Sequence, residues 1–88
     1  MVTQAAFNFT EKPFPPPNPK WGEDTDNYRL YHHLKIHREI LLSEIHHTIV
    51  CDTARMRDIR PWLKTHGFNY VVSKVRDSEY LYKVIEVG

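Results

Sequence analysis

The chain has little glycine and little cysteine, and each shortage excludes a class of function. Its 88 residues include 3 glycines and 1 cysteine. The glycines, Gly22, Gly67 and Gly88, lie too far apart for a phosphate-cradling loop, which needs several glycines close together. A single cysteine, Cys51, cannot form a disulfide within the chain, which is typical of a reducing compartment. We therefore expect a cytoplasmic protein without a glycine-loop nucleotide site.

Long apolar runs and an excess of charge of one sign are also missing. No stretch approaches the roughly 20 apolar residues of a membrane-spanning helix, and the first residues lack the basic and apolar regions of a secretory signal. Twelve Lys and Arg nearly balance eleven Asp and Glu, for a formal net charge of +1. Overall charge thus favours neither nucleic acid nor a membrane as partner. We expect one soluble domain with no membrane contact.

Proline, by contrast, is concentrated in one place. Five of the six prolines fall within the segment PFPPPNP near the N-terminus. Proline removes amide donors and holds the chain extended. The composition therefore predicts a proline-rich extended arm over residues 1–24, followed by a single compact domain over residues 25–88. The arm either lies across the domain through Phe14 and Trp21 or binds an aromatic groove on another protein.

The domain opens with a helical pattern. Apolar residues recur at helical spacing and predict a long helix from Thr25 to Ile45. Two observations conflict with this interpretation: Arg38 falls inside the apolar stripe, and residues 28–36 also alternate as a strand would. The stripe consists of Leu30, Leu34, Leu41 and Ile45.

A strand and a second helix follow. The β-rich run Thr48–Cys51 predicts a short strand, and the apolar spacing after it predicts a helix that ends at Gly67. Pro61 falls within this helix. Either the regular helix begins near Asp58, so that the proline lies in its first turn, or the helix begins at Thr53 and kinks.

The last part of the chain predicts a strand hairpin. Residues 70–75 and 80–87 are rich in β-branched and aromatic residues and are joined by Arg76-Asp77-Ser78-Glu79. The predicted fold is therefore α+β: a long N-terminal helix and then a β-α-β-β unit with a small three-stranded mixed sheet. This half-ferredoxin-like order is shared with RNA-recognition and small regulatory domains. The aromatic signatures of the RNA-recognition family are absent, so this order of elements does not indicate one particular family.

Two surfaces of the predicted domain could bind a ligand. Alternate residues of the hairpin form a tyrosine face, which could stack single-stranded bases or be covered by a helix or a second subunit. A basic stripe on the central helix could follow a phosphate backbone or pair with nearby carboxylates. The tyrosine face consists of Tyr70, Val72, Lys74, Tyr80, Tyr82 and Val84, and the basic stripe of Arg57, Arg60 and Lys64.

Patterns for catalysis and metal binding are weak. His33 and His37 are spaced i, i+4 and Glu44 falls on the same side of the predicted helix, which is the only spacing that suggests a divalent metal. Cys51, with Asp52 and a histidine near it, lacks a glycine turn that would present a nucleophile. We therefore expect no enzyme activity, no cofactor and no metal site.

The sequence leaves two main hypotheses for function. The first is a non-catalytic protein-interaction or regulatory module that binds another protein or itself, as a homodimer. The alternative is a protein that binds single-stranded RNA or DNA through the tyrosine face and the basic stripe. A small metal- or cysteine-dependent enzyme is a second alternative.

Overall fold

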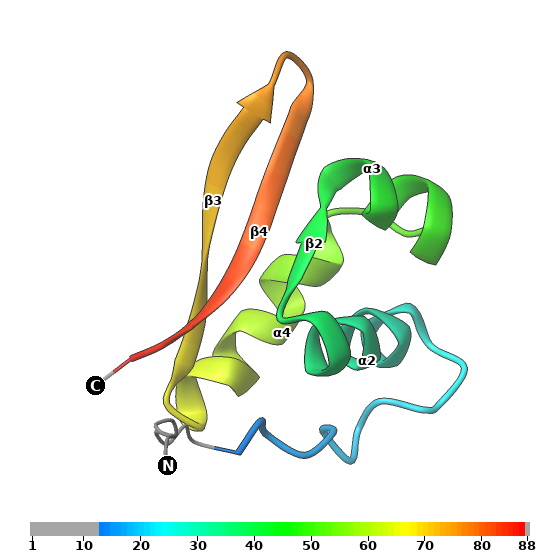
Figure 1. The fold of residues 1–88 in the computed structure, drawn as a ribbon. Helices are drawn as coiled ribbons and strands as arrows, with labels where there is room; N and C mark the ends of the chain where they lie inside the picture. Colours follow the sequence, from blue (N-terminus) through cyan, green and yellow to red (C-terminus); the bar gives the residue numbers. More distant parts are fainter. Residues whose placement is uncertain (1–12, 88) are drawn as a thin grey trace, which may run out of the picture.

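The structure is a computed structural model that describes residues 13–87. The chain forms helices and strands in the order helix, strand, two consecutive helical segments, helix, strand, strand (Figure 1). The elements are α2 (Asp26–His37), β2 (Glu39–Leu41), α3 (Leu42–Glu44), the π-helical segment η1 (Ile45–Ile49), α4 (Ala54–Thr65), β3 (Phe68–Arg76) and β4 (Glu79–Glu86). The α+β class predicted from the sequence is confirmed.

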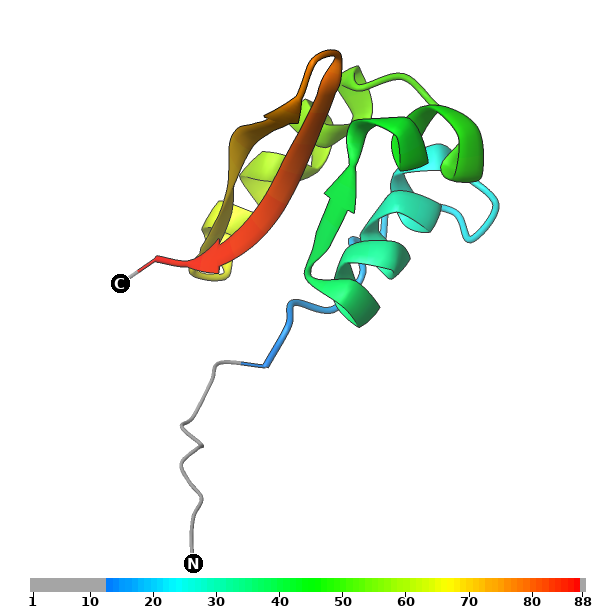
Figure 2. The ribbon, with the colours of Figure 1, turned by 45° about the horizontal axis from the view of Figure 1, so that its top comes forward.

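The three strands form an antiparallel sheet in the order β2-β4-β3. Helices α2 and α4 lie on one side of this sheet (Figures 1 and 2). The alternation along the strands points Ile40, Phe68, Tyr70 and Val84 toward these helices, and all four are buried. The rest of the core comes from the helices: Leu30, Leu34, Ile45, Ile49, Met56, Ile59 and Leu63.

The prediction of one long helix to Ile45 was wrong. Helix α2 begins at a Thr25 cap, whose Oγ1 accepts a hydrogen bond from Tyr28 N at 3.3 Å. It ends at His37, and the next residue, Arg38, has a left-handed backbone conformation (φ 63°). The next three residues, Glu39–Leu41, extend and pair with β4. The charged residue inside the apolar stripe therefore marks the end of the helix.

The predicted strand at Thr48–Cys51 and the predicted mixed sheet were also wrong. Ile45 and Ile49 are one helical turn apart, and both are buried, so the run folds as η1 and packs both residues into the core. The third strand of the sheet is β2 instead, and all strand pairs are antiparallel.

The central helix and the hairpin agree with the sequence prediction. Helix α4 begins at Ala54 and contains Pro61 in its interior, so the earlier of the two predicted starts is correct. Gly67 follows the helix with φ 84°, a conformation that glycine adopts at little cost. Strands β3 and β4 pair over nearly their whole length and turn at Asp77 and Ser78.

The described part of the proline-rich arm, from Pro13 onward, lies on the domain. The Phe14 ring is 5.7 Å from the ring of Tyr31 and 5.6 Å from that of Phe68. The ring centroids of Trp21 and Trp62 are 6.3 Å apart. Two arm carbonyls accept hydrogen bonds from the domain at 2.7 Å, Pro15 O from Tyr31 Oη and Pro16 O from Trp62 Nε1. Residues 1–12 of the predicted arm lie outside the described residues.

No helix within residues 13–87 is both long enough and apolar enough to cross a membrane.

Candidate nucleic-acid interface

Helical segment 42–49, which consists of α3 and the π-helical η1, is followed by a turn and then by helix α4, and this order of elements is here called the helix–turn–helix. The four residues Val50–Thr53 connect them, which is the usual length of the turn in this motif. Val50 has a left-handed conformation (φ 62°), and Cys51 N donates to Ile45 O at 3.0 Å, so the chain reverses tightly. Asp52 then accepts a hydrogen bond from Ala54 N at 2.7 Å, which starts α4 and lowers the pKa of the Asp52 carboxyl.

The outer face of α4 carries two cations that form no ion pair with the described residues. Met56, Ile59 and Leu63 bury one face of the helix, which leaves Arg57 and Lys64 exposed on the other side. The nearby Asp58 pairs with Arg55 at 3.1 Å. None of the four ion pairs found among residues 13–87 includes a member of the basic stripe. Both exposed side chains are therefore available to an anion.

Arg60, the third member of the basic stripe, belongs to the packing between α4 and β3. Its guanidinium lies over the Tyr70 ring, 4.0 Å from the centroid, and Nη2 donates to Tyr70 O at 3.3 Å. Tyr70 N donates to Asn69 Oδ1 at 2.8 Å. The backbone carbonyl and amide of Tyr70 on the strand edge away from β4 are thus both hydrogen-bonded to side chains. Sequence spacing could not show that Arg60 differs from Arg57 and Lys64, because its contact with Tyr70 depends on how strand β3 packs against the helix.

The tyrosine face exists, but its exposure changes along the hairpin. The strand register pairs Tyr70 with Val84, Val72 with Tyr82, and Lys74 with Tyr80. Tyr70 is 4% exposed, and its burial raises the pKa of its hydroxyl. Tyr82 packs beside it at 5.7 Å between ring centroids and is half-buried, whereas Tyr80 is 37% exposed. Only the part of this face near the turn is therefore open to a ligand.

The hairpin extends past the helices and carries two more cations at its tip (Figure 1). Lys74 pairs with Asp77 at 3.5 Å, and Arg76 lies 3.9 Å from the carboxylate of Glu79. Every residue from Val71 to Ser78 is exposed. The tip is thus a solvent-exposed ribbon next to the helix–turn–helix.

A buried carboxylate attaches this hairpin to the helix–turn–helix. Glu79 is 6% exposed, and its two oxygens accept hydrogen bonds from Ser43 N at 3.0 Å and Ser43 Oγ at 2.7 Å. The hydroxyl bond, followed by the amide bond, lowers the pKa of Glu79. Sequence analysis missed this contact because its partners are 36 residues apart and neither residue type has a distinctive local pattern.

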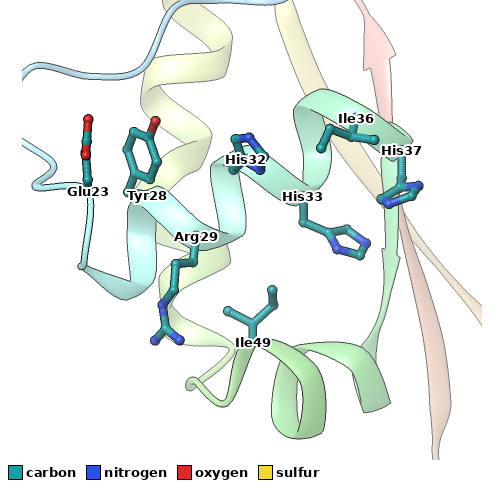
Figure 3. A pocket seen from close by; sticks show the side chains of 8 residues that line it. All are labelled: Glu23, Tyr28, Arg29, His32, His33, Ile36, His37 and Ile49. Carbon is teal, nitrogen blue, oxygen red and sulfur yellow. The ribbon is translucent and has the colours of Figure 1, made fainter.

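The histidines predicted as weak metal ligands lie beside a shallow groove of about 400 Å³ between α2 and η1. His33 points toward Ile49, whereas His32 points to the other side of α2 (Figure 3). The His33 and His37 rings are 4.5 Å apart, and partial burial lowers the pKa of His33. Glu44 accepts a hydrogen bond from Leu41 N at 2.9 Å. Across residues 13–87, no three His, Cys, Asp or Glu side chains are arranged to hold a metal ion.

Cys51 lies in the turn of the helix–turn–helix, half-buried against the core. Burial raises the pKa of its thiol, with Asp26 adding to the effect. The thiol is therefore protonated near neutral pH, and a protonated thiol is a weak nucleophile.

Comparison of the chain with family models, with curated proteins and with solved structures gave no match.

Proposed function

We propose that this domain binds double-stranded nucleic acid, with α4 in the major groove and the hairpin tip beside the phosphate backbone. The observation that carries the proposal is the helix–turn–helix whose second helix exposes Arg57 and Lys64, neither of them in an ion pair with the described residues. In this motif the second helix enters the major groove while the first helix crosses the backbone. An exposed two-stranded ribbon can also contact duplex nucleic acid.

The distribution of charge along the chain supports this orientation. Residues 54–86, which form α4 and the hairpin, contain seven Lys and Arg and four Asp and Glu. Residues 13–53 contain four Lys and Arg and six Asp and Glu. A nearly neutral protein can therefore present a basic surface to phosphate, with its acidic residues elsewhere.

The exposure of the tyrosines favours a duplex over a single strand, which was the nucleic acid of the alternative hypothesis. A stacking platform needs several exposed rings in a row. Tyr70 is covered by Arg60 and Tyr82 is half-buried, so Tyr80 is the one well-exposed tyrosine of the tyrosine face.

The test is the salt dependence of binding to a labelled 20-base-pair DNA duplex, measured by fluorescence anisotropy. The Arg57→Ala/Lys64→Ala double variant should weaken binding. The slope of log affinity against log salt should also become shallower by about 0.9 for each phosphate that the variant no longer neutralises. Lys35→Ala is the matched control, because Lys35 is an exposed cation on α2, away from the proposed interface.

Three results would count against the proposal. One is no binding of the unmutated protein at about 50 mM salt, a concentration at which phosphate contacts are strong. Another is an equal loss in the Lys35→Ala control. The third is tighter binding to a single strand than to the duplex, combined with weaker single-strand binding by Tyr80→Ala. This result would support the single-strand hypothesis instead.

A second candidate function is a protein-interaction module that binds itself or another protein. It is favoured by the exposed apolar side chains of the hairpin, Val71, Val72, Val75, Tyr80 and Ile85. These side chains lie on both faces of the hairpin, and exposed apolar side chains gathered on one element of a small domain are a feature of interaction sites.

A further inference from the structure

The side of the sheet opposite α2 and α4, here called the outward face, is left open by these two helices (Figures 1 and 2), and α3 reaches it at Glu79. Strand alternation and register place Asn69, Val71 and Ser73 of β3 on it, beside Ile85, Lys83 and Leu81 of β4. Glu39 and Leu41 of β2 continue the face on the other side of β4. This surface is separate from the tyrosine face.

Exposed apolar side chains concentrate around this sheet. Residues 13–87 contain eight exposed large apolar side chains, and six of them belong to β3, β4 or the residue after β4. On the outward face itself, Val71 is 47% exposed and Ile85 is 37% exposed. They are diagonal neighbours across the β3–β4 pair, so they form one patch. A domain this small gains stability when a partner covers such a patch.

The charges of the outward face identify the partner. Lys83 lies next to the apolar patch, and Glu39 lies directly opposite Lys83 on the neighbouring strand. Neither takes part in the four ion pairs found among residues 13–87. A face with one free cation and one free anion side by side is complementary to itself after a two-fold rotation.

We propose that the outward face is the interface of a symmetric homodimer, in which Lys83 of each copy faces Glu39 of the other. The two sheets stack face to face at the usual separation of about 10 Å, with Val71, Leu81 and Ile85 between them. The dimer does not depend on the proposed function. If both hold, the two α4 helices lie on the two outer sides of the stacked sheets.

The test is the mass of the full chain without nucleic acid, measured by sedimentation equilibrium from about 10 to 200 µM. The unmutated protein should sediment at twice its 10.5 kDa. Lys83→Glu and Glu39→Lys should each be monomeric, because each places two like charges on the outward face of both copies. An equimolar mixture of the two variants should recover the dimer mass, because one face is then doubly acidic and the other doubly basic.

Mixing leaves every chain unchanged, so a gain in mass reports only the contact between chains. The control is Lys35→Glu, which makes the same charge change on α2 and should remain dimeric. Far-UV circular dichroism checks that each variant is folded. For variants that do not fold, Val71→Ser removes apolar contact without adding charge and should raise the dimer dissociation constant roughly tenfold.

The proposal is overturned if the unmutated protein is monomeric up to 200 µM, or if Lys83→Glu dimerises like the unmutated protein. A dimer that Val71→Ser leaves unchanged would place the interface on another face. A mixture that stays monomeric would refute the reciprocal charge contact. None of these outcomes bears on duplex binding, which is measured separately.

Discussion

Glu79 is the one charged side chain that is buried among residues 13–87. A buried carboxylate costs free energy unless hydrogen bonds compensate it, and here the amide and hydroxyl of Ser43 do so. Because these bonds favour the charged form, the folded state holds the pKa of Glu79 below its ordinary value of 4.5. The resulting stability is present above the unfolded pKa and is lost as the pH falls through the folded pKa.

We expect Ser43→Ala to raise the pKa of Glu79 toward its ordinary value, because the hydroxyl bond is the largest cause of the shift. Two measurements check this: an NMR titration of the Glu79 carboxyl, and urea unfolding at several pH values below 4.5. The dependence of stability on pH in that range should become weaker. Ser73→Ala, an exposed serine on β3, is the control and should change neither result. An unchanged Glu79 titration in Ser43→Ala would contradict the assignment.

Residue roles could be predicted from the sequence only where they depend on local spacing. Helical periodicity placed Arg57 and Lys64 on the exposed side of the central helix, and both are exposed. The same spacing could not predict that Arg60 lies over Tyr70, because that contact depends on how β3 packs beside the helix. Residue type likewise gave no sign of the contact between Ser43 and Glu79.

Val50 is the residue at which η1 ends and the turn of the helix–turn–helix begins. It has φ 62°, a conformation that is unfavourable for a β-branched residue, and its side chain is 66% exposed, so no packing compensates the strain. We expect Val50→Gly to raise the free energy of unfolding by about 0.5–1 kcal/mol, the strain relieved minus the extra entropy of glycine in the unfolded chain. Urea unfolding measures this change.

The control for Val50→Gly is Val72→Gly, which replaces an exposed valine in the ordinary extended conformation of β3. Glycine in a strand interior should lower stability there. The two substitutions therefore should act in opposite directions. A loss of stability in both would show that the valine side chain at position 50 contributes more than its backbone strain costs.

At the level of elements, the sequence predicted those that depend on a regular pattern and failed where backbone conformation changes abruptly. The central helix and the hairpin were correct because period and turn residues agree over many positions. The helix predicted to reach Ile45 stops at His37 because Arg38 takes a left-handed conformation. The spacing of apolar residues, on which the prediction rested, does not encode this backbone conformation. The predicted strand at Thr48–Cys51 reflected β-branched composition, but the core selects the helical spacing of Ile45 and Ile49.

On the scale of the whole molecule, the proline-rich segment packs on the helices and the sheet. Phe14 contacts rings from α2 and β3, and the Arg38 guanidinium lies 4.8 Å from its ring centroid. Sequence composition alone suggests that residues 1–18 can be removed without unfolding the domain. Whether these contacts are structurally important can be decided by a single substitution.

We expect Phe14→Ala to lower the free energy of unfolding by about 2 kcal/mol, less than for a fully buried phenylalanine because Phe14 is half-buried. In a domain of this size the melting temperature should fall by roughly 10 °C, which calorimetry or thermal circular dichroism can measure. Pro19→Ala, in the exposed part of the same segment, should change stability by less than about 0.5 kcal/mol. Equal stability of Phe14→Ala and the unmutated protein would mean that the arm contributes no packing energy.

Strand β3 is an edge of the sheet, and an unpaired edge can recruit a strand from another molecule and begin fibril growth. At Tyr70, the carbonyl on this edge accepts a hydrogen bond from Arg60, and the amide donates one to the side chain of Asn69. An incoming strand would have to displace both before it could pair along β3. The free length of edge is then restricted to the region from Val72 to Arg76, which is shorter than the segments of about six or seven residues that form steric zippers. Two side chains thus make the exposed edge resistant to aggregation.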